Sequence, residues 1–487
     1  KRLREKGKVP KDQPALPQDP FLMLRCLLCP RTNDLYANID CRDNKCEQCK
    51  DLRLLVGKDG KGGLLKANEL DSASHGVAVK WERWEKSENP VTGKPGWDFR
   101  TVTTDIADVI KELKPPYASP SSALGPRCGW FQQFCEHHDL SRYMDDQKKH
   151  KRRKFLRGCV HVVEDFSENG SFTVKLEHQT RYYETHSYTL CGCVVESHVE
   201  DRVDLSDEEK AALIALLDAN NLPHIITDTH IMLSEDTVHD PAAVMHFNGT
   251  VLIPKLKEMI PTLKHMHLTT DGAPTQFMHK DLYFWISRCK RLYGITMDWV
   301  IGAAAHSKDL SDSECGGAKH SVDTKNVEHS ASDEVRGDRI STVPEVIAHL
   351  RTPYPVGYGT TKKTMKQKKG KGIRARYFYH IPLKTISRRH VKAESLDGSK
   401  KLHQFLDIGQ PGKLLVRHRP CHLCPGCMAL DKEKIINECQ HTDRAGQAYI
   451  ADIKPVSGQA TLPTTRDAVA QRGRRLSAAA KPGDFVA

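Results

Sequence analysis

Short runs in which apolar and polar residues alternate dominate the middle of the chain. This period of two predicts strands with one buried face. Turn residues such as Asn169-Gly170 separate the runs. We expect three consecutive antiparallel strands over residues 159–166, 171–178 and 187–197. Further strands are predicted over residues 224–228, 265–271 and 295–302.

Apolar residues spaced three and four apart predict helices between these strands. Ser206 and Glu209 form a capping box that opens one helix. Other helices are predicted over residues 241–260 and 277–292, and a last one in the polar segment 306–320. Nearer the N-terminus, we expect a strand over residues 81–85 and helices over residues 101–114 and 130–145. The predicted fold class is therefore α/β (α+β), with a mixed sheet flanked by helices.

The order of elements is three strands, a helical region, a strand, a helix, a strand and a last helix. This is close to the ribonuclease-H-like order, in which the first strand lies centrally beside the strand that follows the helical region. The helix from residue 206 and the strand 224–228 exceed the minimal order. We interpret them as an elaboration, in which Asp228 has no assigned role.

Three acidic positions follow from this arrangement. Asp165 ends the first strand, and Asp271 ends its expected neighbour in an Asp-Gly turn. Asp312 or Glu314 on the last helix is expected to reach them. An isolated Asp-Gly pair is typical of an ordinary turn. Three crowded carboxylates, however, repel one another unless a cation offsets their charge. Mg²⁺ prefers carboxylate oxygen, and a pair of Mg²⁺ ions cleaves phosphodiesters, so we expect catalytic Mg²⁺ here.

Three segments carry a resemblance to a known family: HVVEDFSENGSF, HLTTDGAPTQF and HSKDLSDSECGGAKH. They resemble the blocks DFSEN, SDGxxxQFKN and HGKGxxDGxGGxxK of a group of transposon-derived eukaryotic proteins. The resemblance covers about residues 159–322. It implies a DDE/DDD transposase-type domain of the ribonuclease-H-like superfamily, with Asp165 and Asp271 as the first two catalytic acids. It also implies that His306 and Lys308 either contact the scissile phosphate or position the segment.

The sequence departs from the family blocks at two places. The third block reads DSECGG, with what looks like one extra residue, so Asp312 is the first choice for the third acid and Glu314 the alternative. The family's QFKN is replaced by Gln276-Phe277-Met278-His279. These departures leave open a catalytically inactive descendant.

Charge points to a polyanionic partner. The 487 residues carry a formal net charge of +12, and two basic runs, residues 148–157 and 362–376, contain no acid. Such runs suit nucleic acid, although a lone run is also typical of a solvated tail or a nuclear-import signal. The candidate nucleic-acid contacts are Lys151, Arg152, Arg153, Lys368, Lys369 and Lys371. Together with the family resemblance, which implies transposon ends as one form of the DNA, these runs lead us to expect DNA as the partner and a nuclear location.

Cysteine spacing predicts two metal sites. Nine of the 16 cysteines lie in two clusters, which is unlike a small secreted disulfide scaffold. In the first cluster Cys26, Cys29, Cys46 and Cys49 are the simplest set of four ligands, with Cys41 as a spare or a substitute. In the second cluster the ligands are Cys421, Cys424, Cys427 and Cys439. Four thiolates close a structural Zn²⁺ site; an iron–sulfur cluster uses related spacing.

These features divide the chain into six predicted regions. They are a disordered basic N-terminus (1–20), a cysteine-rich zinc module (21–55), a helical or mixed DNA-contacting region (56–158), the ribonuclease-H-like domain (159–335), a basic region with the second zinc module (345–445) and a disordered tail (446–487). No apolar run approaches the ~20 residues that cross a bilayer, so no membrane partner is expected. Homo-oligomerisation is left open.

The function predicted from the sequence is DNA binding with cutting and joining of phosphodiester bonds by a two-metal mechanism. One alternative is an inactive, domesticated transposase that binds nucleic acid through its zinc modules. A second alternative is a ribonuclease-H-like nuclease without transposition, since the fold and the site chemistry are shared.

Overall fold

The structure, a computed structural model, describes residues 78–88, 95–105, 130–153, 156–172, 187–273, 275–303, 310–330, 340–351 and 372–456. The chain divides into two units, Lys1–Asp145 and Asp146–Ala487. In the first unit β1 (Ala78–Glu88) pairs with β2 (Pro95–Asp105) as an antiparallel pair. The strand predicted over residues 81–85 is confirmed. Residues 101–105 belong to β2, so the helix predicted from residue 101 is wrong there.

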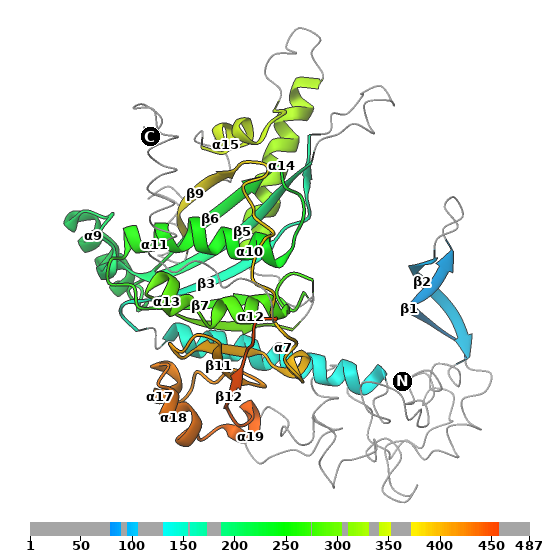
Figure 1. The fold of residues 1–487 in the computed structure, drawn as a ribbon. Helices are drawn as coiled ribbons and strands as arrows, with labels where there is room; N and C mark the ends of the chain where they lie inside the picture. The colour runs from blue at the N-terminus through cyan, green and yellow to red at the C-terminus, as the bar shows by residue number, and fades with distance from the viewer. Residues whose placement is uncertain are drawn as a thin grey trace, which may run out of the picture. The chain divides into compact units, whose positions relative to one another are not determined.

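The second unit is built on one ten-stranded mixed sheet (Figure 1). Its strands are β3 (Cys159–Phe166), β4 (Gly170–Ser171), β5 (Ser187–His198), β6 (Ile225–Ser234), β7 (His265–Thr270), β8 (Thr296–Ile301), β9 (Ile373–Ile381), β10 (Gln404–Asp407), β11 (Lys413–Arg417) and β12 (Tyr449–Asp452). The order across the sheet is β12-β11-β10-β8-β7-β3-β5-β6-β9, and β4 pairs with β5.

The central strands reproduce the order expected from the sequence, with one correction. β3 lies between β5, to which it is antiparallel, and β7, to which it is parallel. The third long strand is β6, which pairs antiparallel with β5 along its whole length. The interpretation of residues 224–228 as an elaboration is therefore wrong, because residues 225–228 begin β6, the third long strand of the antiparallel part of the sheet. Of the strand predicted over residues 171–178, Ser171 lies in β4, and residues 173–178 lie outside the described residues.

Helices cover both faces of the sheet. They are α7 (Trp130–Arg153), η1 (Val199–Asp201), α9 (Asp207–Asp218), α10 (Pro241–His246), η2 (Phe247–Leu252), α11 (Ile253–Met259), α12 (Lys280–Ile286), α13 (Cys289–Tyr293), α14 (Leu310–Ser330), α15 (Val343–Arg351), η3 (Ser399–Lys401), α17 (Pro425–Met428), α18 (Lys432–Asn437) and α19 (Thr442–Ala445). The capping box of Ser206 and Glu209 is formed at the start of α9, as predicted. None of the helices in the described ranges has both the length and the apolar character that a bilayer crossing requires.

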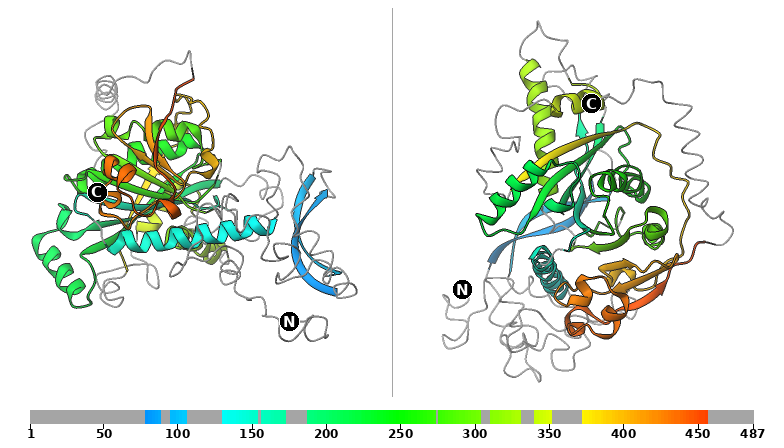
Figure 2. Two further views of the ribbon diagram at one scale, coloured as in Figure 1. Left: turned by 90° about the horizontal axis from the view of Figure 1, so that it is seen from below. Right: turned by 90° about the vertical axis from the view of Figure 1, so that its left-hand side faces the viewer.

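We call the two faces of the sheet face A and face B. On face A, Val160, Val162 and Leu268 pack against α10 to α13 in the largest apolar core. On face B, Leu190 and Leu233 pack against α14 and α15, and Leu406 and Leu415 pack against the cysteine-rich segment. The right-hand view of Figure 2 shows α14 and the α10–α13 layer on opposite sides of the strands. Because side chains alternate along a strand, odd-numbered residues of β3 and β7 project on face B.

The C-terminal part extends this sheet. β9 pairs parallel with β6 at one edge, and β10, β11 and β12 continue from β8 at the other. The predicted division between a domain ending at residue 335 and a module starting at residue 345 is thus not a division between sheets. The predicted disordered tail from residue 446 is wrong for residues 449–456, since β12 and the Ala393–Pro455 bridge belong to the ordered part.

Candidate active site and cysteine cluster

Asp165 and Asp271 lie at the carboxyl ends of two adjacent parallel strands. β3 and β7 pair with Val163 opposite Thr269. The same register, continued by two residues, places Asp165 opposite Asp271, and both project on face B. The Ala273 N–H donates a 3.0 Å hydrogen bond to Asp271 Oδ1, which holds that carboxylate at the start of the turn. The sequence prediction that these two acids meet at one sheet edge is therefore matched by the strand pairing.

Asp312 reaches the same place from α14. Gly192 is the β5 residue opposite Asp165. A Cβ on Gly192 would come within 2.6 Å of Cys315 Sγ and 3.3 Å of the Ser311 carbonyl oxygen, so α14 lies directly on the sheet here. Asp312 lies between these two contact residues in the sequence, and its carboxyl group is close enough to that of Asp165 to raise the pKa of Asp165. The absence of a side chain at residue 192 thus brings the third acid to the first.

The acids perturb one another electrostatically. Burial, followed by repulsion from Asp271 and Asp312, raises the pKa of Asp165 to about 8. Burial is also the main cause that raises the pKa of Asp271, with a further contribution from Asp312. Raised carboxyl pKa values mean that the site carries more negative charge than its surroundings stabilise. A bound cation would relieve this excess.

Glu314, the alternative third acid, is engaged elsewhere. Its Oε2 lies 2.5 Å from Arg376 Nε, and its Oε1 accepts a 3.0 Å hydrogen bond from Arg376 Nη2. Such a two-pronged Arg–carboxylate pair neutralises the acid and fixes its direction. The pair joins α14 to β9, so Glu314 has a structural partner and Asp312 is the third acid of the cluster.

The three aspartates do not form a single-ion cage. Among the described residues, two groups of side chains place three or more ligand atoms all within 4.8 Å of one another, and neither group contains these aspartates. Ligands that share two ions about 3.5–4 Å apart spread over a wider span than ligands of one ion. The donor chemistry fits Mg²⁺, which takes carboxylate oxygens and keeps several waters.

Lys151 is the one predicted nucleic-acid contact whose side chain lies within the described residues. Lys151 is 2% exposed, and burial lowers its pKa to about 8, with Asp298 and Glu196 as its nearby acids. A buried side chain cannot form part of a binding surface, so the assignment of Lys151 is wrong. The other assignments lie outside what the structure describes: His306, Lys308, Lys368, Lys369 and Lys371 entirely, and Arg152 and Arg153 in their side chains.

The second cysteine cluster assembles as its spacing predicts. The Sγ atoms of Cys421, Cys424, Cys427 and Cys439 all lie within 4.8 Å of one another. Cys424 Sγ is 3.8 Å from Cys421 Sγ and 3.9 Å from Cys439 Sγ. These distances match the ~3.8 Å edge of a thiolate tetrahedron around an ion at ~2.3 Å. Cys26, Cys29, Cys46, Cys49 and the spare Cys41 lie outside the described residues.

Other groups adjoin the four thiols. His441 Nδ1 lies 3.1 Å from Cys424 Sγ, and the Arg417 guanidinium donates to Cys427 Sγ over 3.8 Å. Hydrogen bonds from Cys421 and Cys427, together with the charge of Arg417, lower the pKa of Cys439. Hydrogen bonds within the cluster and burial raise the pKa values of Cys421 and Cys427. Thiolate, the form that binds metal, is therefore favoured at Cys439, and a bound cation would favour it at Cys421 and Cys427 as well. The His422 N–H donates to Gln147 Oε1 over 2.6 Å, which ties the segment to α7.

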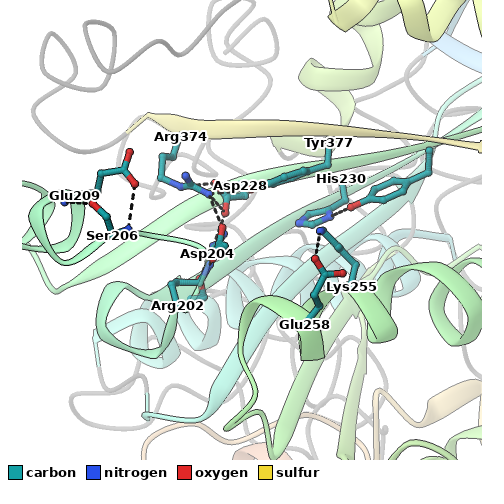
Figure 3. Close-up of polar contacts among 12 residues, drawn as sticks. Arg202, Asp204, Ser206, Glu209, Asp228, His230, Lys255, Glu258, Arg374 and Tyr377 are labelled. Carbon is teal, nitrogen blue, oxygen red and sulfur yellow. Dashed lines mark hydrogen bonds and ion pairs between the residues drawn. The ribbon is translucent and has the colours of Figure 1, made fainter. Parts of the chain in front are cut away.

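Asp228, unassigned from the sequence, belongs to a buried ion cluster (Figure 3). Its Oδ2 lies 2.5 Å from Arg202 Nη1, and its Oδ1 accepts a 2.9 Å hydrogen bond from Arg374 Nε. Arg202 also binds Asp204 through two 2.7 Å hydrogen bonds. Both Arg202 and Asp228 are 1% exposed. Asp228 therefore joins β6 to β9 and to the loop after η1, and has no part in the acidic cluster.

Sequence reasoning missed a row of buried polar residues on face B. His161 lies 3.1 Å from Glu196 Oε2 and 3.2 Å from Thr269 Oγ1. His267 lies 2.9 Å from Asp298 Oδ2, and Asp298 Oδ1 accepts from the Gln404 amide over 2.9 Å. The alternation offered a signal, because His161 has the parity of Asp165 and His267 that of Asp271. This row lies beneath Lys151 and continues the face that carries the acids.

Comparison with known proteins adds one match. A protein-family model described as "Domain of unknown function (DUF8701)" matches residues 212–410. The matched part contains Asp271 and Asp312 but begins after Asp165, and it covers less than half of the chain. No curated protein and no solved structure matches.

Proposed function

We propose that the protein binds DNA and cleaves or joins phosphodiester bonds with Mg²⁺ held by Asp165, Asp271 and Asp312. The observation that carries the proposal is that these acids, from β3, β7 and α14, lie close together. The alternative acid, Glu314, is instead paired with Arg376. Buried, mutually repelling carboxylates are expensive in a purely structural role, and they are typical of a site that binds a cation.

The arrangement of the central strands supports a ribonuclease-H-like domain. The sheet order β6-β5-β3-β7-β8 has three antiparallel strands followed by two parallel ones. In this order the first strand lies centrally, beside the strand that follows the helical region, as in the ribonuclease-H-like order. In such a sheet the carboxyl ends of β3, β7 and β8 lie at one edge, where loops open onto a crevice. The resemblance of the three sequence blocks to transposon-derived proteins supports DNA as the substrate.

Each acid has a defined task in this proposal. Asp165 and Asp271, fixed by the strands and by the Ala273 hydrogen bond, would hold Mg²⁺ from the sheet, and Asp312 would close the site from α14. When bound, Mg²⁺ activates the attacking oxygen and stabilises the leaving oxygen of a phosphodiester. The chain itself positions the acids and keeps Glu314 away from the site.

We further propose a structural Zn²⁺ at Cys421, Cys424, Cys427 and Cys439. Four thiolates leave no open position for chemistry. The four cysteines pack with Leu406 and Leu415 on face B, so the ion would fasten the C-terminal segment to the sheet.

The test is magnesium-dependent nicking of labelled DNA by the full chain. Asp165→Asn, Asp271→Asn and Asp312→Asn are each expected to abolish nicking and to retain DNA binding. The matched control is Asp323→Asn, an exposed acid on the same helix α14, which should keep full activity. If Glu314→Gln abolished nicking and Asp312→Asn nicked normally, the third acid would be Glu314 and not Asp312.

Two outcomes would favour the alternatives. DNA binding without nicking by the wild-type chain, over a range of Mg²⁺ and Mn²⁺, would identify an inactive descendant. Nicking of RNA–DNA hybrids or of arbitrary ends, with no strand transfer, would identify a nuclease on the same fold.

A further inference from the structure

An open pocket of about 610 Å³ lies where the chain leaves β6 and β9. It is lined by residues from two segments, 235–238 after β6 and 383–389 after β9. β9 is absent from the minimal order predicted from the sequence, so this pocket is a feature of the extended sheet. Neither the family match nor the three acidic blocks assigns it a role.

Strand directions place the pocket on the acidic edge of the sheet. β3 and β6 both run antiparallel to β5, and β9 runs parallel to β6. The carboxyl ends of β3, β6 and β9 therefore point the same way. The loops that follow these three strands lie along one edge, with Asp165 after β3 and the pocket after β6 and β9.

Direct contacts link the acidic cluster to the pocket. The ring of Phe166, next to Asp165, stacks on His239 with centroids 4.5 Å apart. Asn169 lies between them and the pocket wall: its Oδ1 is 2.9 Å from His239 Nε2, and its amide donates to the Thr237 carbonyl over 3.3 Å. The pocket wall is thus connected to the β3 loop by ring stacking and hydrogen bonds.

Two cations in the pocket are available to a ligand. Asp236 binds Arg388 through hydrogen bonds of 2.7 and 2.9 Å, and Glu235 lies 2.8 Å from His380. Arg388 also donates to Asp240 over 2.7 Å, and both acids of the lining have hydrogen-bond partners. Among the described residues, the exposed side chains of Lys384 and Arg389 make no hydrogen bond or ion pair. The lining carries three basic side chains against two acids, which gives it a net positive charge.

The pocket also exposes apolar surface and a strained backbone. Val238 and Leu383 are 52% and 55% exposed, which offers a base an aliphatic surface. Lys384 has a φ of 68°, in the left-handed region that side chains other than glycine rarely adopt. Backbone strain of this kind costs about 1–3 kcal/mol and collects at sites that bind ligands.

We propose that this pocket binds the DNA strand flanking the scissile bond as a single strand, with phosphates against Lys384 and Arg389 and one base against Val238 and Leu383. A base reaches aliphatic side chains only when it is unstacked, which favours a single strand over a duplex. The inference rests on the proposed function for the position of the scissile bond, but not for binding itself.

The test is the affinity of the full chain for short labelled single-stranded DNA, measured by fluorescence anisotropy in EDTA at several salt concentrations. Lys384→Ala with Arg389→Ala should raise Kd about tenfold and lower the slope of log Kd against log salt by about 1.4, since each lost phosphate contact removes about 0.7. Leu383→Ser should raise Kd and leave this slope unchanged.

The matched control is Lys290→Ala with Arg291→Ala, an exposed Lys–Arg pair on α13, at the opposite end of β8. It should bind as the wild type does. Lys384→Gly relaxes the backbone, so weaker binding by this variant cannot be attributed to misfolding. Equal affinities of the pocket and control variants would overturn the proposal. EDTA prevents nicking, so the binding assay is independent of catalysis. If the pocket variants bind DNA more weakly but the wild type does not nick DNA in Mg²⁺, the proposed enzymatic function is rejected and the binding pocket is retained. If the wild type nicks DNA but the pocket variants bind as tightly as it does, the binding pocket is rejected and the enzymatic function is retained.

Discussion

Gly192 on β5 lies directly beneath Cys315 on α14, so that a Cβ at residue 192 would come within 2.6 Å of Cys315 Sγ. Gly192 is also the cross-strand partner of Asp165. The same close approach that seats α14 on the sheet therefore sets the separation between Asp312 and Asp165. Position 192 accepts a hydrogen atom but no methyl group.

Gly192→Ala should displace α14 and separate the acids. We expect a loss of about 1–3 kcal/mol in the free energy of unfolding from overpacking. We expect nicking to fall about 100-fold, because a shift of about 1 Å at a catalytic group has that effect. Urea denaturation and the Mg²⁺ nicking assay measure the two changes.

A second substitution and a control sharpen this test. Cys315→Ala in the Gly192→Ala background removes the nearest clash and should restore part of both losses. Gly316 lies in α14 with nothing within 4 Å of a Cβ, so Gly316→Ala should keep activity and stabilise the helix by up to about 1 kcal/mol. Full activity in Gly192→Ala would show that α14 is not held at this distance.

The positions of the first two acids of the cluster could be predicted from the sequence because they depend on local patterns. Asp165 and Asp271 each end a run with a period of two, and the order of elements around them is enough to predict that their strands are neighbours. The choice between Asp312 and Glu314 was not open to the same reasoning. It depends on Arg376, 62 residues further along the chain, on a strand whose place in the sheet no local pattern reveals.

Two misinterpretations have the same physical origin. Lys151 lies in a run of basic residues, and only the fold shows that it is buried near Asp298. Residues 224–228 were interpreted as an elaboration because they exceed the minimal order of elements, and the predicted strand stopped at Asp228, within β6. Beyond it, Thr229, His230 and Ser234 are polar residues that are fully buried in β6. Long-range partners, which composition and periodicity do not encode, decide both cases.

Asp228→Asn should be strongly destabilising and catalytically silent. It leaves Arg202, 1% exposed, and Arg374 without the charge that they share. Breaking a buried ion pair on one side costs about 3–5 kcal/mol. Thermal unfolding measures this loss. Nicking per folded molecule, assayed well below the lowered Tm, should equal that of the wild type. A specific loss of nicking would instead make Asp228 a catalytic candidate.

His230 should make the fold sensitive to acid. Burial lowers its pKa to about 4, and its ring stacks on Tyr377 and Tyr379, with Nδ1 2.8 Å from the Tyr379 hydroxyl. The charged groups that act on it are Asp228, Arg202, Lys255 and Arg374. Because the folded-state pKa lies below the unfolded value of about 6.5, the stabilisation is complete above pH 6.5 and is lost as pH falls towards 4.

The size of this effect can be isolated by substitution. One histidine with these pKa values lowers the free energy of unfolding by about 2 kcal/mol when the pH falls from 7.5 to 5. His230→Gln cannot titrate, so its free energy of unfolding should fall by about 2 kcal/mol less than that of the wild type over this range. Urea denaturation at the two pH values gives both numbers. Identical pH dependence in the two proteins would mean that His230 takes up its proton equally well in the folded state.

Substitutions at the cysteines and at His441 distinguish the possible ligands of the cysteine cluster. Cys424→Ser and Cys439→Ser should each lower the zinc content by about one ion per chain and lower the Tm, because a structural zinc site contributes directly to folding. Cys159→Ala, a buried thiol outside the cluster, should leave the zinc content unchanged. His441 is the informative neighbour, since its Nδ1 lies 3.1 Å from Cys424 Sγ. His441→Ala should retain zinc if four thiolates bind the ion, whereas a loss equal to that in Cys439→Ser would mean that His441 replaces one cysteine in the ligand set.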